Sequence, residues 1–135
     1  MSQQLLSIIV PVYNEETSLP YLEQRVNDLV AALDIGTEII LVDDGSRDNS
    51  MTIMRAISAR NPRYKVISLS RNFGHQIAIT AGLDAANGDA CVIMDSDLQD
   101  PPELIVQMLA RWREGYHVVY AQRRTREGET LFKKA

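Results

Sequence analysis

Residues 38–46 read Glu-Ile-Ile-Leu-Val-Asp-Asp-Gly-Ser. Four apolar side chains follow one another in this stretch, and acidic and turn-forming residues come directly after them. A short apolar run without polar alternation is typical of a strand that is buried on both faces, as in a parallel sheet. The stretch therefore predicts a central strand over residues 38–42 that ends in a polar loop.

Similar apolar runs lie on either side of this strand, over residues 7–12, 65–69, 90–94 and 116–121. Between the runs, apolar side chains recur at steps of three and four, as in amphipathic helices. This spacing predicts helices over about 19–33, 51–57, 75–86 and 104–112. Because strands and helices alternate, we expect one α/β domain with an open, mainly parallel sheet and helices on both faces.

The chain has 135 residues, the length of one domain. Its net charge of −4 argues against nucleic-acid binding, but the charge is uneven, at −8 over residues 1–110 and +4 over 111–135. We expect a core over 1–122 and a basic, flexible tail over 123–135.

The lone Cys91 excludes an intramolecular disulfide, and its apolar neighbours predict a buried, inert thiol. Without a signal peptide or an apolar run long enough to span a bilayer, we expect this chain to be soluble and cytoplasmic. In a full-length form, we expect the tail to lead to an acceptor or membrane part and the protein to be membrane-associated.

Ionisable and amide side chains follow the predicted strands where each strand ends. Parallel strands bring these ends to one edge of the sheet, where ligands of open α/β sheets bind. Five carboxylates are expected to crowd there, and such crowding calls for a compensating cation. Asp95 and Asp97, with one residue between them after a buried strand, are suited to chelate a hard divalent ion such as Mg²⁺ or Mn²⁺. The five carboxylates are Glu15, Asp43, Asp44, Asp95 and Asp97.

The sequence argues against several other classes of nucleotide or phosphate site. The turn after the first strand, residues 12–16, contains no glycine, and no Gly-x-x-x-x-Gly-Lys motif is present, so a glycine-rich phosphate loop is excluded. A receiver domain would carry its acidic pair after the first strand and a lysine after the fifth. A nucleotidyltransferase would carry a basic, glycine-rich first loop. A nucleotide-binding fragment without turnover stays open.

Four motifs in order carry a family resemblance: Ile-Val-Pro-Val-Tyr-Asn-Glu at 9–15, Val-Asp-Asp-Gly-Ser at 42–46, Ser-Arg-Asn-Phe-Gly at 70–74 and Asp-Ser-Asp-Leu-Gln-Asp-Pro-Pro-Glu at 95–103. The chain resembles the family 2 glycosyltransferases, and among them the polyprenyl-phosphate branch that includes bactoprenol glucosyltransferases and dolichyl-phosphate mannosyltransferase. The resemblance covers residues 5–127 and implies the GT-A fold of nucleotide-diphospho-sugar transferases.

The resemblance also implies roles for individual residues. Asp44 matches a position that accepts a hydrogen bond from the base, and Arg123 matches a catalytic arginine that faces phosphate or sugar. The residues around Arg123 depart from the Gly-Ser-Arg of many relatives. We infer from their place on the edge that Arg71 and Asn72 lie on the sugar and phosphate side. The implied nucleotide-binding set is Pro11, Tyr13, Glu15, Val42, Asp44, Asp95 and Ser96, and the implied metal ligands are Asp95, Asp97 and Gln99.

By resemblance, the expected reaction is the inverting, metal-dependent transfer of a hexose from a nucleotide-diphosphate sugar to a polyprenyl phosphate at the cytoplasmic membrane face. UDP-glucose is the expected donor, from the bactoprenol-like segments. Asp97 is the expected catalytic metal ligand, and an anionic acceptor phosphate needs no assigned general base. The basic tail suits an anionic membrane surface. A saccharide acceptor, a fragment that is inactive alone and a homo-oligomer are alternatives that the sequence leaves open.

Overall fold

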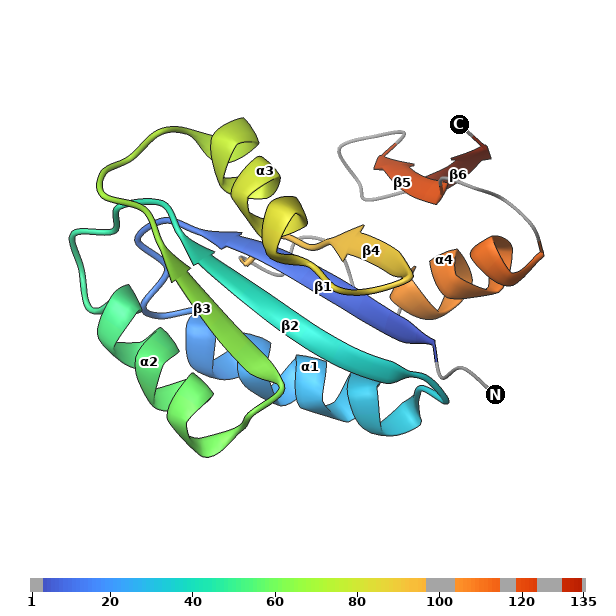
Figure 1. Cartoon of the computed structure of the whole chain (residues 1–135), viewed down its shortest axis with the longest axis horizontal. Coiled ribbons are helices and arrows are strands. Elements are labelled where there is room, and N and C mark those ends of the chain that lie inside the picture. Colours follow the sequence, from blue (N-terminus) through green and yellow to red (C-terminus); the bar gives the residue numbers. More distant parts are fainter. Residues whose placement is uncertain (1–3, 97–103, 115–118, 124–129, 135) are drawn as a thin grey trace.

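The structure is a computed structural model that describes residues 4–96, 104–114, 119–123 and 130–134. Strands and helices alternate along the chain, as the apolar pattern predicts (Figure 1). In chain order, the elements are β1 (Leu5–Val12), α1 (Leu19–Ala32), β2 (Gly36–Asp43), α2 (Ser50–Arg60), β3 (Tyr64–Ser68), α3 (His75–Ala85), β4 (Ala90–Ile93), α4 (Leu104–Arg113), β5 (Val119–Arg123) and β6 (Thr130–Lys134).

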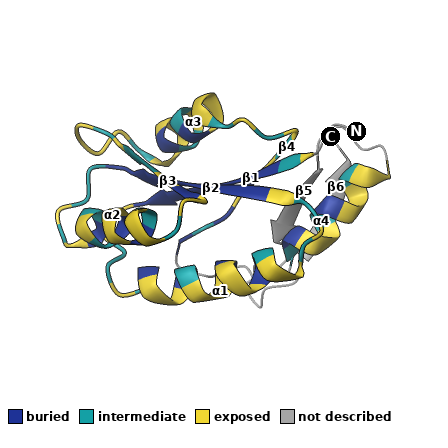
Figure 2. Ribbon diagram, turned by 60° about the horizontal axis from the view of Figure 1, so that its bottom comes forward, coloured by how far each residue is buried: buried dark blue, intermediate teal, exposed yellow. Residues whose placement is uncertain are grey.

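The main sheet has four parallel strands in the order β3-β2-β1-β4. Helices cover both of its faces, with α3 on one and α1 and α2 on the other (Figure 2). The larger core cluster lies on the α1–α2 face and includes Ile105 of α4. A smaller cluster under α3 contains Ile9, Ile40, Val42 and Ala78. These observations confirm the predicted α/β class, the parallel sheet and its two helical layers.

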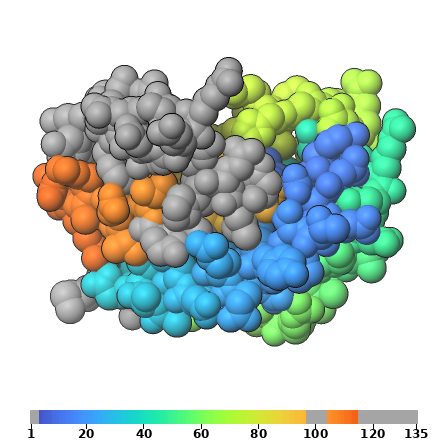
Figure 3. All heavy atoms as spheres, turned by 180° about the vertical axis from the view of Figure 1, so that it is seen from behind, coloured from blue at the N-terminus to red at the C-terminus, as the bar shows by residue number. Residues whose placement is uncertain are grey.

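The helix ends follow from local sequence. Pro20 lies in the first turn of α1, where its missing N–H leaves no hydrogen bond unmade. Seen from behind, α1 and α4 are both at the surface of the molecule (Figure 3). Arg113, the last residue of α4, forms an ion pair with Asp34 just beyond α1, with 2.9 Å between Nη1 and Oδ1. This contact joins two helices that lie far apart in the chain.

The fifth strand corrects one prediction. The sequence predicted that the run over 116–121 would extend the parallel sheet, whereas β5 pairs antiparallel with β6 in a separate two-stranded sheet. An apolar run favours a strand but does not specify which strand it pairs with. No strand was predicted in the basic tail either, yet β6 covers Thr130–Lys134. The domain boundary at residue 122 stays a prediction.

Strand β4 gives a second correction. It is the edge strand of the main sheet. Val92 is buried on the α1–α2 face, whereas Cys91 and Ile93 on either side of it point to the opposite face, the one that α3 covers elsewhere. Cys91 is exposed and Ile93 is 45% exposed, so the predicted buried thiol is wrong. The pattern of residues correctly identified a strand. Burial on both faces, however, also requires a covering element on each face, and α3 packs mainly on β1 and β2 rather than on β4.

The amino ends of the strands are tied together around Glu38, whose side chain is buried. Its carboxylate accepts hydrogen bonds from Ser7 Oγ at 2.5 Å and from the backbone N–H of Asn87 at 2.6 Å. Lys65 Nζ lies 2.6 Å away and completes the set. Burial acts to raise the pKa of Glu38, but these contacts outweigh it and hold that pKa at about 2. The network fixes β1, β2, β3 and the turn before β4.

At the carboxyl edge of the sheet, the pairing register determines which strand ends lie side by side. Val12 pairs with Asp43 and Asp43 pairs with Ser68, so β1, β2 and β3 end side by side. Strand β4 ends beside β1, because Ile93 pairs with Ile9 and the next N–H, that of Met94, bonds to the Ile9 carbonyl at 2.9 Å. The residues that follow these strands therefore meet at one carboxyl edge, as the topology predicts.

Candidate active site at the carboxyl edge

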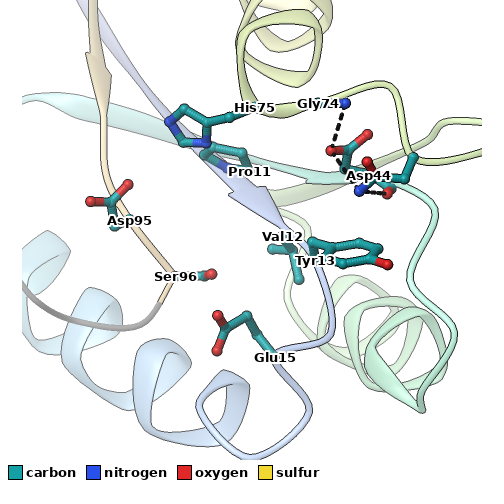
Figure 4. A pocket seen from close by; sticks show the side chains of 10 residues that line it. Pro11, Val12, Tyr13, Glu15, Asp44, Gly74, His75, Asp95 and Ser96 are labelled. Atoms are coloured by element: carbon teal, nitrogen blue, oxygen red, sulfur yellow. Dashed lines mark hydrogen bonds between the residues drawn. The ribbon is translucent and has the colours of Figure 1, made fainter.

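A cavity of about 620 Å³ opens at the carboxyl edge of the main sheet (Figure 4). The end of β1, the residues after β2 and β4, and the start of α3 form its walls. Three carboxylates, one imidazole and other oxygen-bearing side chains line it together with apolar groups. The lining residues are Pro11, Val12, Tyr13, Glu15, Asp44, Asn72, Gly74, His75, Asp95 and Ser96.

The loops after β1 and β2 hold each other by hydrogen bonds. Asn14 has a positive φ of 52°. This conformation, which asparagine tolerates better than most residues, turns the chain so that its side-chain oxygen accepts a hydrogen bond from the N–H of Arg47 at 2.8 Å. In return, the N–H of Asn14 donates to Ser46 Oγ at 2.9 Å. The two loops form one wall of the cavity.

Further contacts orient the start of α1 and Glu15. The N–H of Glu15 donates to Ser50 Oγ at 2.8 Å, and its carboxylate accepts a hydrogen bond from Ser18 Oγ at 3.0 Å. Asp48 accepts N–H hydrogen bonds from Ser50 and Glu16 at 2.8 and 3.2 Å. Burial acts to raise the pKa of Asp48, but the hydrogen bonds from Ser50 and Glu16 outweigh it and lower that pKa. These hydrogen bonds fix the position of Glu15 at the cavity.

Asp44 connects the sheet to the loop before α3. Its buried carboxylate accepts hydrogen bonds from the N–H groups of Phe73 at 2.8 Å and Gly74 at 3.1 Å, and from Asn72 Nδ2 at 3.2 Å. All three donors are neutral and come from consecutive residues. Asp44 therefore has a structural task, the positioning of residues 72–74, which the sequence analysis did not predict.

Gly45 allows this loop to approach closely. It has a φ of +72°, and a Cβ added there would lie 2.4 Å from backbone atoms of Arg71 and Asn72. Glycine is required both by the left-handed conformation and by the contact. Asp44 thus binds the loop at residues 71–74 by hydrogen bonds, and Gly45 allows the backbone of that loop to pack directly against the end of β2.

A second cavity, of about 460 Å³, lies next to the first and shares Tyr13 and Asn72 with it. Arg47 and Arg71 give this cavity a cationic lining, in contrast to the carboxylates of the first. Its other lining residues are Asp43, Gly45, Ser46, Met51, Ser68, Leu69 and Ser70. The Arg71 guanidinium also lies 4.7 Å above the centre of the Phe73 ring. Anionic and cationic surfaces thus meet along Tyr13 and Asn72.

The structure brings together most of the predicted site residues that it describes. Pro11, Tyr13, Glu15, Asp44, Asn72, Asp95 and Ser96 line the first cavity and Arg71 lines the second. Val42 does not join them, because its side chain is fully buried in the cluster under α3. Asp97, Gln99 and the side chain of Arg123 lie outside the described residues.

His75 lines the first cavity but was not among the predicted site residues. It begins α3 and projects from the loop that Asp44 holds (Figure 4). Its position directly after Gly74, at a helix start on the carboxyl edge, was the signal that could have placed it there.

Two carboxylates of the first cavity are of the type that binds divalent metal ions. Asp95 and Glu15 supply carboxylate oxygens to the same cavity, and such hard oxygen ligands fit Mg²⁺ or Mn²⁺. Within the described ranges, no group of three or more acidic, histidine or cysteine side chains could hold a metal ion. Two of the three predicted ligands fall outside those ranges, so the metal assignment rests on the residue types and their spacing.

The open parallel sheet with a cavity at its carboxyl edge is the fold of the GT-A glycosyltransferases, as solved structures of similar fold show. Staphylococcus aureus TarS 1–349 in complex with UDP-GlcNAc has a similar fold, with a TM-score of 0.60 and 30% identity over 83% of this chain and 32% of that chain. The chain belongs to glycosyl transferase family 2, whose model matches residues 7–135.

Relatives by sequence lie in the same family. The chain is 55% identical to the uncharacterized glycosyltransferase YkcC of Bacillus subtilis, over 95% of this chain and 40% of the relative. It is 41% identical to an undecaprenyl-phosphate 4-deoxy-4-formamido-L-arabinose transferase of Aeromonas hydrophila, over 97% of this chain and 40% of that protein. The chain thus spans about two fifths of the length of these relatives. No helix among the described residues is long and apolar enough to cross a membrane.

Proposed function

We propose that the protein transfers a hexose, with inversion, from a nucleotide-diphosphate sugar to a polyprenyl phosphate at the cytoplasmic face of the membrane. The observation that carries this proposal is the first cavity, which gathers seven residues expected in the donor site from four loops and the end of β1. The Aeromonas relative, whose name states an undecaprenyl-phosphate acceptor, supports the acceptor class.

The donor is proposed to occupy the first cavity. Its nucleoside lies along Pro11 and Tyr13, at the end of β1, and its diphosphate extends toward Asp95 and Ser96. Arg71 and Asn72 then lie toward the phosphates and the sugar, where the cationic lining of the second cavity begins. UDP-glucose is the proposed donor.

The proposed reaction is a direct displacement at the anomeric carbon. An anionic oxygen of the lipid phosphate forms the new bond to that carbon as the bond to the β-phosphate oxygen breaks, and the bonding electron pair leaves with the nucleoside diphosphate. Fixed positive charge beside the departing phosphate lowers the barrier, and Arg123 is the proposed source within this chain. The acceptor oxygen is ionised at neutral pH, so no residue is assigned as a general base.

A divalent metal would be held by Asp95, Asp97 and Gln99. Bound there, Mg²⁺ or Mn²⁺ supplies positive charge for the donor diphosphate. The carboxylates of Asp95 and Asp97 would provide hard oxygen ligands for that ion. Without a cation, the carboxylates that share the first cavity would repel an anionic donor.

Calorimetric titration of the chain with UDP-glucose tests the donor site. We expect binding in the presence of Mn²⁺ and its loss when EDTA is added. GDP-mannose is the comparison ligand, and stronger binding of GDP-mannose would overturn the choice of donor. The absence of metal-dependent binding of either nucleotide sugar would overturn the proposed function.

Turnover is tested separately, because the chain spans only two fifths of its relatives. The chain is incubated with UDP-glucose, Mn²⁺ and undecaprenyl phosphate, and glucosyl lipid is measured. Donor binding without product would favour the alternative of a nucleotide-sugar-binding unit that is inactive by itself. Transfer to a saccharide but not to the lipid phosphate would favour the other alternative, a saccharide acceptor.

A further inference from the structure

An apolar surface lies at the rim of the first cavity, on the side of α3. Phe73 precedes the helix and is 38% exposed, and Ile77 lies in its first turn and is 49% exposed. Between them in the chain, Gly74 and His75 line the cavity. Tyr13, 43% exposed, lies at the same cavity. Three of the seven large hydrophobic side chains that are exposed in the described part of the chain thus line the first cavity or lie within two residues of one that does.

The position of this surface is fixed. The N–H of Phe73 donates to Asp44 at 2.8 Å, and the next N–H, that of Gly74, donates to the same carboxylate. The Arg71 guanidinium lies 4.7 Å above the Phe73 ring. The backbone of Phe73 is therefore held beside residues that line the cavity, with a cation over its exposed ring. Ile77, also exposed, follows one helical turn later. Single exposed apolar residues are common, but an apolar ring held beside a cation and next to a cavity is suited to contact a ligand.

The charges around the rim select the occupant. The first cavity is lined by three carboxylates, whereas the neighbouring cavity is lined by two arginines, Arg47 and Arg71, and one carboxylate, Asp43. An anionic group would thus be attracted from the Arg71 side and repelled from the opposite wall. A ligand with a phosphate head and an apolar tail matches a cation beside an apolar strip.

We propose that Phe73 and Ile77 bind the isoprenoid units next to the phosphate of the lipid acceptor, while Arg71 attracts that phosphate to the cavity. This inference rests on the proposed function and extends it, because it assigns an entry side to the acceptor. The tail leaves the cavity over the start of α3, opposite the wall formed by Glu15. We call the surface of Arg71, Phe73 and Ile77 the acceptor rim.

The acceptor rim is tested with farnesyl phosphate, a short polyprenyl phosphate, titrated calorimetrically below its micelle concentration into the chain with Mn²⁺ and UDP. We expect Phe73→Ser and Ile77→Ser each to weaken its binding about tenfold, as expected when an apolar contact of this size is lost. Val106→Ser is the matched control, because Val106 is 46% exposed on α4, away from the cavity, and should leave binding unchanged. Unchanged binding in both rim variants would overturn the proposal.

Two further ligands separate the contribution of the phosphate group to binding from that of the isoprenoid tail. Farnesol and inorganic phosphate should each bind more weakly than farnesyl phosphate, and equal binding of farnesol would overturn the role of Arg71. Leu83→Ser, which removes a 43% exposed side chain from the far end of α3, should have no effect. A loss equal to that of Ile77→Ser would show that the whole helix face contacts lipid and would overturn a local acceptor rim.

The donor titration distinguishes this proposal from the proposed function. Ile77→Ser should leave the affinity for UDP-glucose with Mn²⁺ unchanged, because Ile77 does not line the first cavity. If the unmodified chain binds no nucleotide sugar, the proposed function fails. If it binds the donor normally but the rim variants keep their affinity for farnesyl phosphate, the acceptor rim alone fails.

Photo-crosslinking tests the proposal without any variant. A benzophenone analogue of farnesyl phosphate should label residues 73–77 of the unmodified chain, and labelling elsewhere would overturn the proposal.

Discussion

The two edges of the main sheet each contain a buried carboxylate that accepts three hydrogen bonds. At the amino edge, Glu38 accepts them from Ser7, Lys65 and Asn87. At the carboxyl edge, Asp44 accepts them from Asn72, Phe73 and Gly74. Both carboxylates fasten a loop at one end of α3 to the sheet, since residue 87 follows that helix and residues 72–74 precede it. The number of hydrogen bonds therefore does not distinguish a structural edge from a functional one.

The surroundings of the two carboxylates do distinguish the edges. Glu38 has a cation as a partner, which compensates its charge. Asp44 has only neutral donors and borders a cavity with two further carboxylates, Glu15 and Asp95. At the amino edge a cation within the protein neutralises the buried carboxylate, whereas several carboxylates gathered around one cavity are suited to a bound cation. The comparison predicts that changes at the carboxyl edge affect binding and changes at the amino edge affect stability.

The largest effect is expected at the carboxyl edge. Asp97→Ala should abolish metal-dependent binding of UDP-glucose, a loss of at least about 100-fold, because it removes a proposed charged metal ligand. Calorimetry with Mn²⁺ measures the loss. Asp84→Ala, which removes an exposed carboxylate from the far end of α3, is the control and should bind normally. Unchanged affinity in Asp97→Ala would remove Asp97 from the metal site and weaken the contrast between the edges.

Gly45→Ala should affect both stability and binding, because Gly45 allows the carboxyl edge to approach the loop before α3. The added Cβ would be placed in a left-handed conformation and 2.4 Å from backbone atoms, and we expect a loss of about 3 kcal/mol in the free energy of unfolding. Urea denaturation measures it. Gly36→Ala is the matched control, since a Cβ there meets atoms no closer than 3.5 Å, and it should cost less than about 1 kcal/mol. Equal losses would show that the close approach at Gly45 is relieved by loop movement.

A pair of amide substitutions compares the carboxylates directly. Glu38→Gln should lower the free energy of unfolding by about 2 kcal/mol, since it loses the ion pair and turns an amide N–H₂ toward donors. Its affinity for the donor should not change. Asp44→Asn should weaken donor binding through the displaced loop at residues 72–74. Melting temperatures and donor titrations of both variants check the contrast, and weaker donor binding in Glu38→Gln would break it.

The sequence predicted the strands and helices of the main sheet well because burial and periodicity are local signals. The runs over 7–12 and 38–42 lie in fully buried strands, and the polar residues after them meet at the predicted edge. The failures concern pairing and neighbours. Strand β5 was identified, but its antiparallel partner β6 was not, and Cys91 lies in a true strand that lacks a covering layer. Such features depend on which surfaces meet, and a single apolar run does not encode that.

The candidate site divides in the same way. Residue type and position on the edge placed Glu15, Asp95 and Asn72 at a common cavity. The resemblance alone implied that Val42 belongs to the nucleotide site, whereas the apolar run over 38–42 predicted a strand buried on both faces, and Val42 is indeed buried in the cluster under α3. The loop-holding role of Asp44 was equally hidden, because its partners are backbone N–H groups, which every residue except proline carries.

The smallest expected effect is the pH dependence of stability, which arises at the amino edge. The pKa of Glu38 is about 2 in the folded protein and lies near 4.5 for an ordinary glutamate, so the folded state binds a proton less readily than the unfolded chain. The stabilisation by Glu38 is therefore complete above about pH 4.5 and declines as the pH falls toward 2, by about 2 kcal/mol at pH 3. Urea denaturation from pH 6 to pH 3 measures the decline, and Glu38→Gln is the control because it cannot titrate. The unmodified chain should lose more stability than the variant over this range. Parallel curves would mean that carboxylates at the other edge dominate acid sensitivity, and the division of roles between the edges would then be wrong.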